Sequence, residues 1–477
     1  MRPILPLSRL LTTSLALLLL GAASPILAQG RALPPTVSKA LGVANIPLSA
    51  VGVVVQEVGA SSPRLAVNAQ QAMNPASVMK LVTTFTALET LGPAATWKTD
   101  ILATEPVTDG VLSGNLYLRG SGDPKLTAER FWLLLRQLRD RGVKEIRGDL
   151  VLDRSAFSLT ETGANFDDQP LRPYNVGPDA LLLNFKALRL TLSPNPGAKS
   201  VSVLPELLPD NLDLVNLVKL GNNGCGDWKE ALRADLARYG NRYRLALTGS
   251  YSATCGEKVW NLGVMAHDHY VFGLFRLIWR ELGGEITGEV KDGTVPANAR
   301  PLASTDSPTV MEMVRDINKY SNNVMARQLF LSLAQQRGAT PDLAAKAVSR
   351  WLTDKGLAFP ELVLENGSGL SRKERIAPAS LVRLLTNAWE SPLMPEFISS
   401  LPLTAVDGTM QKRLGSYGVA GRAHIKTGTL EGVKTIAGYV QDARGRMMIV
   451  VFLVNHPNAA LAQPAQDALL QWAYEGR

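Results

Sequence analysis

The spacing of three short motifs constrains the fold of this chain more than any other feature. SVMK occupies residues 77–80, SNN residues 321–323 and KTG residues 426–428. Residues 81–320 separate the first two motifs, an interval of 240 residues (320 − 80). Motifs that act together must meet in space, so the domain that holds them must also carry a large insertion. At 477 residues, the chain is long enough for two or three domains.

The SVMK motif pairs a serine with a lysine one helical turn later. Apolar residues dominate 78–91 and Gly92 ends the run, which predicts a buried helix with Ser77 in its first turn. Residues three apart share a helix face, so Lys80 is within reach of the Ser77 hydroxyl. Serine needs a base to take its proton, and burial beside a second cation keeps a lysine neutral enough to be that base. Ser77 is therefore the candidate nucleophile and Lys80 the candidate base.

The SNN motif interrupts a helical stretch. Ser321 and Asn323 are two residues apart, and such residues do not face one another on a regular helix. The motif therefore predicts an irregular turn or a helix start, from which both side chains enter a cleft. There Ser321 is a candidate proton relay to a leaving amine, and Asn323 is a candidate partner of Lys80 and of a substrate amide.

The KTG motif follows a short apolar segment and precedes another expected strand, which predicts a strand at the edge of a cleft. Gly428 lets a substrate backbone approach closely. Lys426 is the candidate second cation near Lys80. With the hydroxyls of Thr427 and Thr429, it forms a candidate pocket for a terminal carboxylate.

The N-terminus has the pattern of an export signal. Arg2 and Arg9 precede the apolar run 10–23, and Ala28 follows as a small residue. This order predicts a signal peptide over residues 1–28, with a retained anchor as the alternative. No later segment approaches 18 unbroken apolar residues, so we expect an exported, periplasmic protein without a transmembrane helix.

The cysteines and histidines are few. Cys225 and Cys255 are the two cysteines of the chain, and such a pair in an exported protein predicts a disulfide. No H-E-x-x-H or C-x-x-C motif occurs, and we interpret His267-Asp268-His269 as the solvated approach to a helix. We therefore expect no metal site.

The chain is basic. Its formal net charge of +8 includes Arg2 and Arg9, which leaves about +6 (8 − 2) after removal of the signal peptide. This charge favours loose association with polyanionic cell-wall polymers or lipid head groups. Nucleic acid is not an expected partner, because the basic residues are dispersed along an exported chain.

The three motifs in this order, with the very wide first interval, resemble the low-molecular-mass class C penicillin-binding proteins, the D-alanyl-D-alanine carboxypeptidase/endopeptidase family. The resemblance covers nearly the whole mature chain. Four further segments support it: GSGDP at 120–124, DRSAF at 153–157, NGSGLSR at 366–372 and VDGT at 406–409. The resemblance implies a multi-domain α+β fold. In it, a serine β-lactamase/DD-peptidase-like catalytic domain, an antiparallel sheet flanked by helices, carries a two-lobed insertion between the first and second motifs.

The expected elements agree with a discontinuous catalytic domain. A strand is predicted near the N-terminus, at 49–58, and a hairpin followed by a closing helix is predicted over 435–474. Both chain ends should therefore meet in one sheet. We expect residues 29–92 and 261–477 to form the catalytic domain, and residues 93–260 to form the inserted region as two subdomains.

The resemblance also implies an activity. Such a protein is a serine DD-peptidase that removes the terminal D-Ala from, or cleaves D-Ala cross-links in, peptidoglycan stem peptides, and it needs no cofactor. Ser77 would be acylated with Lys80 as its base, and the KTG residues would bind the substrate carboxylate. The backbone N–H groups of Ser77 and Thr429 would form the oxyanion hole. β-Lactams would acylate the same serine.

The resemblance extends to substrate contacts, with two departures. Asp153, Phe157 and Arg372 are expected to contact the side chain of the stem peptide. Asn366 stands where relatives often carry Asp, and Glu431 stands where relatives often carry Gln. The second departure is expected to alter recognition of that side chain.

Two other functions share these motifs. A serine β-lactamase needs fast deacylation, for which class A enzymes use a Glu-x-x-x-Asn element between the second and third motifs. Residues 324–425 contain no such element. A non-catalytic cell-wall-binding protein could keep the same fold, but all three motifs are intact here. We therefore favour the peptidase.

Overall fold

The computed structural model describes residues 32–159 and 166–476. The predicted signal peptide, residues 1–28, lies outside the described residues. Within the two described ranges, no helix is both long enough and apolar enough to cross a bilayer.

The catalytic part is built on one antiparallel sheet of five strands, in the order β19-β20-β21-β1-β2. These strands are β1 (Val51–Glu57), β2 (Leu65–Val67), β19 (Ala423–Leu430), β20 (Val433–Gln441) and β21 (Met447–Asn455). The N-terminal β1 pairs with the C-terminal β21 over its whole length. The prediction that both chain ends meet in one sheet is confirmed.

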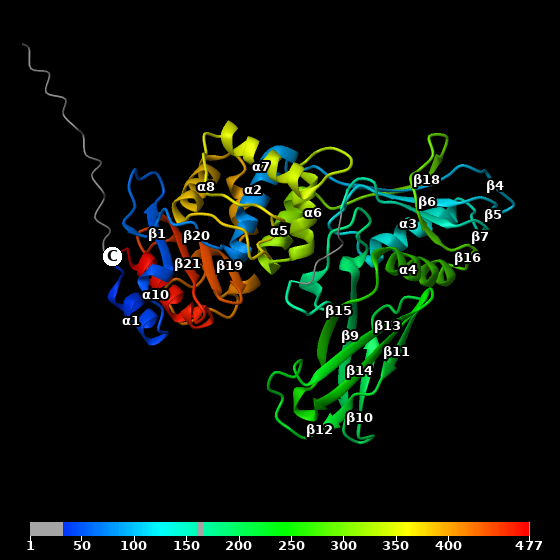
Figure 1. The fold of residues 1–477 in the computed structure, drawn as a ribbon, viewed down its shortest axis with the longest axis horizontal. Helices are drawn as coiled ribbons and strands as arrows, with labels where there is room; N and C mark the ends of the chain where they lie inside the picture. Colours follow the sequence, from blue (N-terminus) through cyan, green and yellow to red (C-terminus); the bar gives the residue numbers. More distant parts are fainter. Residues whose placement is uncertain (1–31, 160–165, 477) are drawn as a thin grey trace, which may run out of the picture.

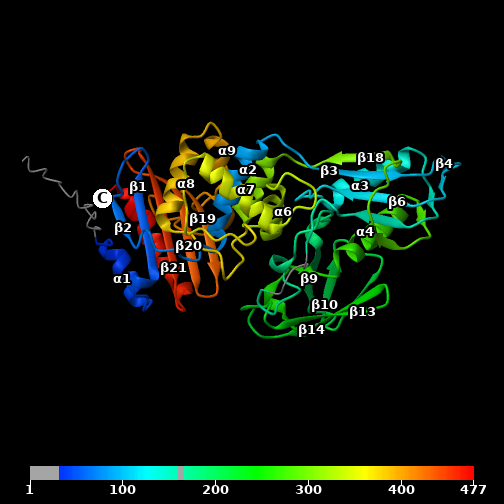
Figure 2. The same ribbon diagram turned by 45° about the horizontal axis from the view of Figure 1, so that its top comes forward.

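Helices cover both faces of this sheet (Figure 2). Val53 and Val55 point to the core under α1 (Pro35–Val43) and α10 (Gln463–Glu475). Val54, between them, points to the opposite core. Because successive strand residues alternate between faces, a strand that is buried on both faces must be apolar throughout. This explains the apolar run at residues 51–55, the fully buried part of β1.

The second face of the sheet carries the helical layer that holds the first two motifs. It contains α2 (Lys80–Leu91), α5 (Val310–Tyr320), α6 (Asn323–Ser332), α7 (Pro341–Asp354), α8 (Pro378–Glu390) and α9 (Met394–Ser400). Short 3₁₀ turns are η1 (Leu48–Ala50), η2 (Ala76–Met79), η6 (Gly408–Met410) and η7 (Ala459–Ala462). Helices α5, α6 and α7 all pack against α2, so α2 is the buried centre of this layer.

The insertion leaves and re-enters the catalytic domain at one place. Its first strand, β3 (Lys98–Ala103), pairs antiparallel with its last, β18 (Arg300–Asp306), and Lys98 lies opposite Asp306. The insertion itself forms two lobes (Figure 1).

The first lobe combines two small sheets, in the orders β17-β8-β6-β3-β18 and β16-β7-β5-β4, with two helices. Its remaining elements are β4 (Val107–Thr108), β5 (Val111–Leu112), β6 (Leu116–Gly120), α3 (Ala128–Asp140), β7 (Glu145–Ile146), β8 (Leu150–Asp153), α4 (His267–Glu281), β16 (Glu285–Ile286) and β17 (Val290–Asp292).

The second lobe is a seven-stranded sheet in the order β11-β14-β12-β10-β9-β15, with β13 paired to β14. Its strands are β9 (Ala187–Asn195), β10 (Ser200–Pro205), β11 (Leu212–Asn216), β12 (Lys219–Gly221), β13 (Leu232–Tyr239), β14 (Arg242–Ser252) and β15 (Lys258–Gly263), and its short turns include η3 (Pro173–Asn175), η4 (Asn184–Lys186) and η5 (Ala253–Cys255). Cys225 and Cys255 form the predicted disulfide in this lobe.

The pairing differs from the predicted boundary at residue 260. Helix α4 packs into the core of the insertion, where Phe275 contacts Phe131. Strand β17 pairs with β8, and β18 pairs with β3. Helical periodicity shows that a segment has an apolar face but not which core buries it. We propose that the insertion spans 98–306 and that 32–97 and 307–476 form the catalytic domain.

Candidate active site

Ser77 lies in the turn η2, immediately before α2. The amide of Ala76 donates to Asn74 Oδ1 at 2.8 Å, and Asn74 Nδ2 donates to the carbonyl of Ser371 at 2.8 Å. Ala76 adopts a left-handed backbone with φ 46°, which is costly for a residue with a side chain. The prediction of a helix with Ser77 in its first turn holds in outline. The first turn is a separate 3₁₀ turn, and contacts with another segment of the chain hold it in place.

Lys80 is fully buried at the start of α2. Its Nζ lies 2.9 Å from Ser77 Oγ, 2.7 Å from Asn323 Oδ1 and 2.5 Å from the carbonyl oxygen of Ser368. Burial lowers the pKa of Lys80 well below its ordinary value, and the charge of Lys426 lowers it further. A neutral amine has two hydrogens and one lone pair. When the two hydrogens go to the amide and carbonyl oxygens, the lone pair is left for the Ser77 hydroxyl.

The SNN motif forms the junction between α5 and α6. Ser321 ends α5 in the left-handed conformation, with φ 55° and ψ 37°. Asn322 then caps α6 by accepting the amide of Met325 at 3.1 Å. The predicted irregular turn is confirmed. It directs Asn323 to Lys80 and Ser321 to Lys426.

The KTG motif lies on β19, the edge strand of the sheet. Lys426 is fully buried, and its Nζ donates to Ser321 Oγ at 2.8 Å and to the carbonyl of Thr427 at 2.9 Å. Burial lowers the pKa of Lys426 to about 7. Thr427 Oγ1 donates to Thr409 Oγ1 at 2.8 Å, whereas Thr429 is exposed. A cation and two hydroxyls therefore line the edge of the site.

Gly428 allows β19 to lie against the nucleophile turn. A methyl group at Gly428 would be 2.9 Å from the amide nitrogen of Ser77, 2.8 Å from the carbonyl oxygen of Pro75 and 2.2 Å from Thr435 Oγ1. Real side chains do not tolerate such distances. The backbone after Gly428 thus runs beside the Ser77 amide, which is the arrangement that a pair of oxyanion-binding N–H groups requires.

The three residues expected to contact a substrate side chain lie in different surroundings. Asp153 is buried in the insertion, and its carboxylate accepts the amides of Ser155 at 3.1 Å and Val295 at 3.0 Å. The ring of Phe157 packs directly on the backbone of Gly122.

Arg372 is exposed beside the end of β19. Its guanidinium lies 4.8 Å from the ring centre of Phe166, and its Nη2 is 3.3 Å from Glu431 Oε2. Glu431 follows β19 directly, so Arg372 stands at the rim of the site, between the KTG strand and the insertion.

Several contributors to the site were not assigned a role from the sequence. The carbonyl of Ser368 and the hydroxyl of Thr409 belong to the NGSGLSR and VDGT segments, which the resemblance identified without assigning a function to either. Asn74, which holds the nucleophile turn, lies outside the motifs. Its role depends on a contact with Ser371, almost 300 residues later, which local pattern does not reveal.

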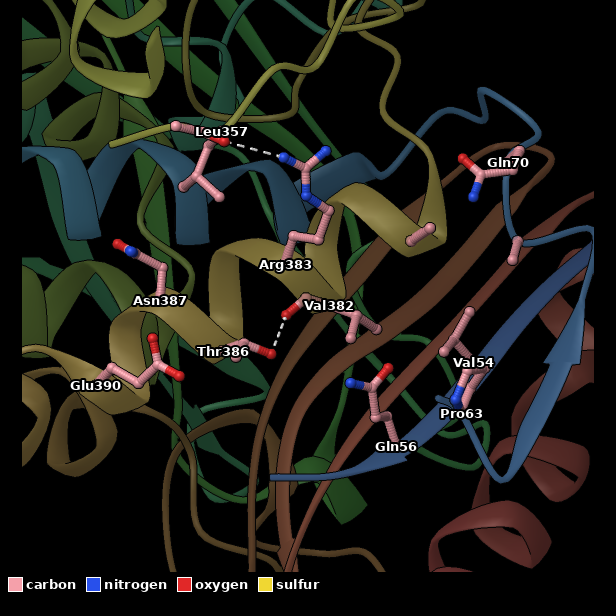
Figure 3. Close-up of a pocket in the computed structure, with 13 residues that line it drawn as sticks. Val54, Gln56, Pro63, Gln70, Leu357, Val382, Arg383, Thr386, Asn387 and Glu390 are labelled. Carbon is pink, nitrogen blue, oxygen red and sulfur yellow. Dashed lines mark hydrogen bonds between the residues drawn. The ribbon is translucent and has the colours of Figure 1, made fainter. Parts of the chain in front are cut away.

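A separate groove lies between β1 and α8 (Figure 3). Arg383 crosses it and donates to the carbonyls of Gly356 at 3.1 Å and Ala358 at 3.0 Å. None of its 13 lining residues belongs to the three motifs. In the described ranges, no three His, Cys, Asp or Glu residues are grouped so that they could hold a metal ion.

Comparison with known proteins gives a family match over nearly all of the chain. The model of the D-Ala-D-Ala carboxypeptidase 3 (S13) family matches residues 35–475. The chain belongs to this family. It is therefore a hydrolase of the serine D-Ala-D-Ala carboxypeptidase type, and the family prediction is confirmed.

Named relatives match over most of their length. The D-alanyl-D-alanine carboxypeptidase of Actinomadura sp. (strain R39) is 30% identical over 88% of this chain and 80% of its own. DacB of Haemophilus influenzae is 28% identical over 85% of each chain. The crystal structure of penicillin binding protein 4 (dacB) from H. influenzae has a TM-score of 0.77 at 26% identity, covering 92% of this chain and 99% of its own. A second structure of that protein contains a β-lactam. The predicted α+β fold class is confirmed.

Proposed function

We propose that this protein hydrolyses the D-Ala-D-Ala ends, or the D-Ala cross-links, of peptidoglycan stem peptides through an acyl-enzyme on Ser77. The observation that carries the proposal is the environment of Lys80. A buried amine with two acceptor-only partners and a lowered pKa presents its lone pair to the Ser77 hydroxyl.

Acylation follows from this arrangement. Lys80 takes the proton from Ser77, and Ser77 Oγ bonds to the carbonyl carbon of the penultimate D-Ala. The backbone N–H groups of Ser77 and Thr429 hold the resulting oxyanion, which the close approach at Gly428 supports. The proton held by Lys80 then passes through Ser321 to the leaving amine as the C–N bond breaks, which returns Lys80 to its neutral form. In the second step Lys80 takes a proton from water, the water oxygen bonds to the ester carbonyl carbon, and the proton returns to Ser77 Oγ as the ester C–O bond breaks.

Binding of the substrate is assigned to the edge strand and the rim. The charged form of Lys426, with Thr427 and Thr429, binds the terminal carboxylate, and Asn323 holds a substrate amide. Arg372 contacts the side chain of the stem peptide. For Asp153 and Phe157 we propose an indirect part, because Asp153 binds backbone amides and Phe157 packs on Gly122. Through these contacts, both residues would shape the part of the insertion that lies near the rim of the active site.

The cellular setting completes the proposal. Membership of a cell-wall enzyme family and the absence of a membrane-spanning helix in the described ranges are consistent with export. We propose that residues 1–28 direct the chain to the periplasm and are removed. The positive charge of the mature chain would hold it loosely at anionic wall polymers or lipid head groups.

Labelling with a fluorescent penicillin tests the nucleophile. Wild-type protein should form a covalent adduct, and Ser77→Ala should form none, because no other group occupies the place of the hydroxyl beside Lys80. Ser202→Ala, an exposed serine of the second lobe, is the matched control and should label as wild type. Circular dichroism checks that Ser77→Ala is folded. Persistent labelling of folded Ser77→Ala would remove the assignment.

Two further measurements separate the alternatives. Rapid turnover of penicillin, in place of a long-lived adduct, would favour a serine β-lactamase. Failure of the wild type to label at all would favour a non-catalytic wall-binding protein. Incubation with defined monomeric and cross-linked muropeptides, followed by mass analysis of the products, then distinguishes carboxypeptidase from endopeptidase activity.

A further inference from the structure

We propose that Glu374 is a positioning residue for the catalytic lysine: its carboxylate holds the turn that presents the Ser368 carbonyl to Lys80, and it sets a negative charge beside that amine. The proposal rests on the assignment of Ser77 and Lys80 given above. Glu374 lies two residues beyond the NGSGLSR segment and belongs to none of the three motifs.

Glu374 holds the turn through backbone amides. Glu374 is fully buried, and its Oε1 accepts three consecutive backbone amides: Glu365 at 3.1 Å, Asn366 at 2.9 Å and Gly367 at 3.0 Å. One carboxylate oxygen therefore holds three consecutive N–H groups of the turn in place. An ionised carboxylate is the acceptor best suited to several N–H groups at once.

The carbonyl side of the same turn faces α2. The carbonyl of Gly367 accepts Thr83 Oγ1 at 2.6 Å, and the next carbonyl, that of Ser368, accepts Lys80 Nζ at 2.5 Å. Ser368 is fully buried, so water does not compete for this contact. A shift of the turn would therefore move an acceptor that orients the lone pair of Lys80 toward Ser77.

Glu374 also acts on Lys80 through its charge. The charged groups that act on Lys80 are Lys426 from β19, Arg327 from α6, and Glu374. The two cations lower the pKa of Lys80, and Glu374 raises it. When Lys80 takes the proton of Ser77 it becomes a third cation in this buried group. Glu374 is the anion that offsets the new charge.

The second oxygen of Glu374 strengthens this interpretation. Oε2 is buried and has no hydrogen-bond partner among the described residues. Arg327, which is partly buried, interacts electrostatically with Glu374 but directs Nη1 to the carbonyl of Val176 at 3.2 Å. Burial raises the pKa of Glu374, while the three amides and Lys80 oppose that rise. A side chain needed only to hold the turn would not require an ionisable group with one oxygen left unbonded.

The test separates charge from shape. Glu374→Gln keeps an acceptor oxygen for the three amides and removes the charge. The measurement is the second-order rate of acylation by a fluorescent penicillin as a function of pH. The rate rises with pH as Lys80 becomes neutral, and loss of the nearby anion favours the neutral amine. The acid limb should therefore move to lower pH, by about one unit.

Glu365→Gln is the matched control. Glu365 belongs to the same turn and carries the same charge, but its side chain is 41% exposed and is paired with Lys373 at 3.3 Å. The acid limb of the Glu365→Gln pH profile should lie at the same pH as that of the wild type. If Glu374→Gln lowers the rate equally at every pH and leaves the limb in place, the electrostatic part of the proposal is overturned.

Glu374→Asp covers the case in which the glutamine variant does not fold. It keeps the charge but shortens the side chain, so the limb should stay while the plateau rate falls about tenfold or more. Acylation at the wild-type rate would overturn the positioning role. Both outcomes leave the proposed function intact as long as wild type labels and Ser77→Ala does not, so the two proposals can fail separately.

Discussion

Lys426 is a site residue whose charge changes near neutral pH. Burial lowers its pKa to about 7, and only its charged form pairs with a terminal carboxylate. For a D-Ala-D-Ala peptide, kcat/KM should therefore fall above about pH 7, approaching tenfold per unit, because kcat/KM reports the free enzyme. Lys426→Arg should remove this alkaline limb, since a guanidinium keeps its proton. Peptide hydrolysis followed from pH 5 to 10 measures both profiles.

If the alkaline limb survives in Lys426→Arg, a group other than Lys426 causes it.

At the residue scale, some parts of the site can be proposed from the sequence and others cannot. Ser77, Lys80 and Lys426 could be proposed as site residues from the sequence, because each sits in a motif whose chemistry restricts the residue type. The Ser368 carbonyl and Glu374 were not, because their parts arise from contacts between segments that are distant in sequence.

At the scale of elements, the close fit of β19 to the turn η2 is the sharpest constraint. Gly428→Ala should lower the rate of penicillin acylation by on the order of 10²-fold, because the new methyl group would push β19 away from the Ser77 amide. Gly415→Ala is the control, since a methyl group there meets nothing closer than 4.0 Å. Stopped-flow labelling compares the two variants. Equal rates would show that β19 can shift without loss of the site.

Element prediction succeeded where local spacing was decisive. The two-residue separation of Ser321 and Asn323 predicted the break between α5 and α6, because a regular helix would point them apart. The sequence pattern around Ser77 did not predict that this residue occupies a 3₁₀ turn distinct from α2. That turn depends on the left-handed Ala76, whose amide Asn74 accepts, and Asn74 is itself held by a tertiary contact with Ser371.

At the scale of the whole molecule, the interval between the motifs predicted an insertion but not its end. Residues 261–306 have ordinary helix and strand patterns that would suit either domain, and our proposal that they belong to the insertion rests on their partners in β3, β8 and α3. The insertion also supports the site. Gln328 of α6 is fully buried and binds Asp179 of the insertion through both its oxygen, at 3.0 Å, and its nitrogen, at 2.8 Å.

The disulfide of the second lobe and the contact between Gln328 and Asp179 can each be removed, to test which part of the insertion affects the active site. Replacing Cys225 and Cys255 together by alanine should destabilise the second lobe by about 3–4 kcal/mol, as expected for a closed loop of this length. Penicillin labelling should remain within about twofold of wild type, because neither cysteine belongs to the core around Lys80.

Gln328→Ala should instead slow labelling, since it leaves the amide of Asp179 unpaired and loosens α6 five residues after Asn323. Thermal unfolding and labelling rates, measured on both variants, provide the test. If the cysteine variant loses labelling in proportion to its stability, the second lobe and the site form one cooperative unit. If it keeps labelling while Gln328→Ala does not, support reaches the site through the Asp179 segment and α6.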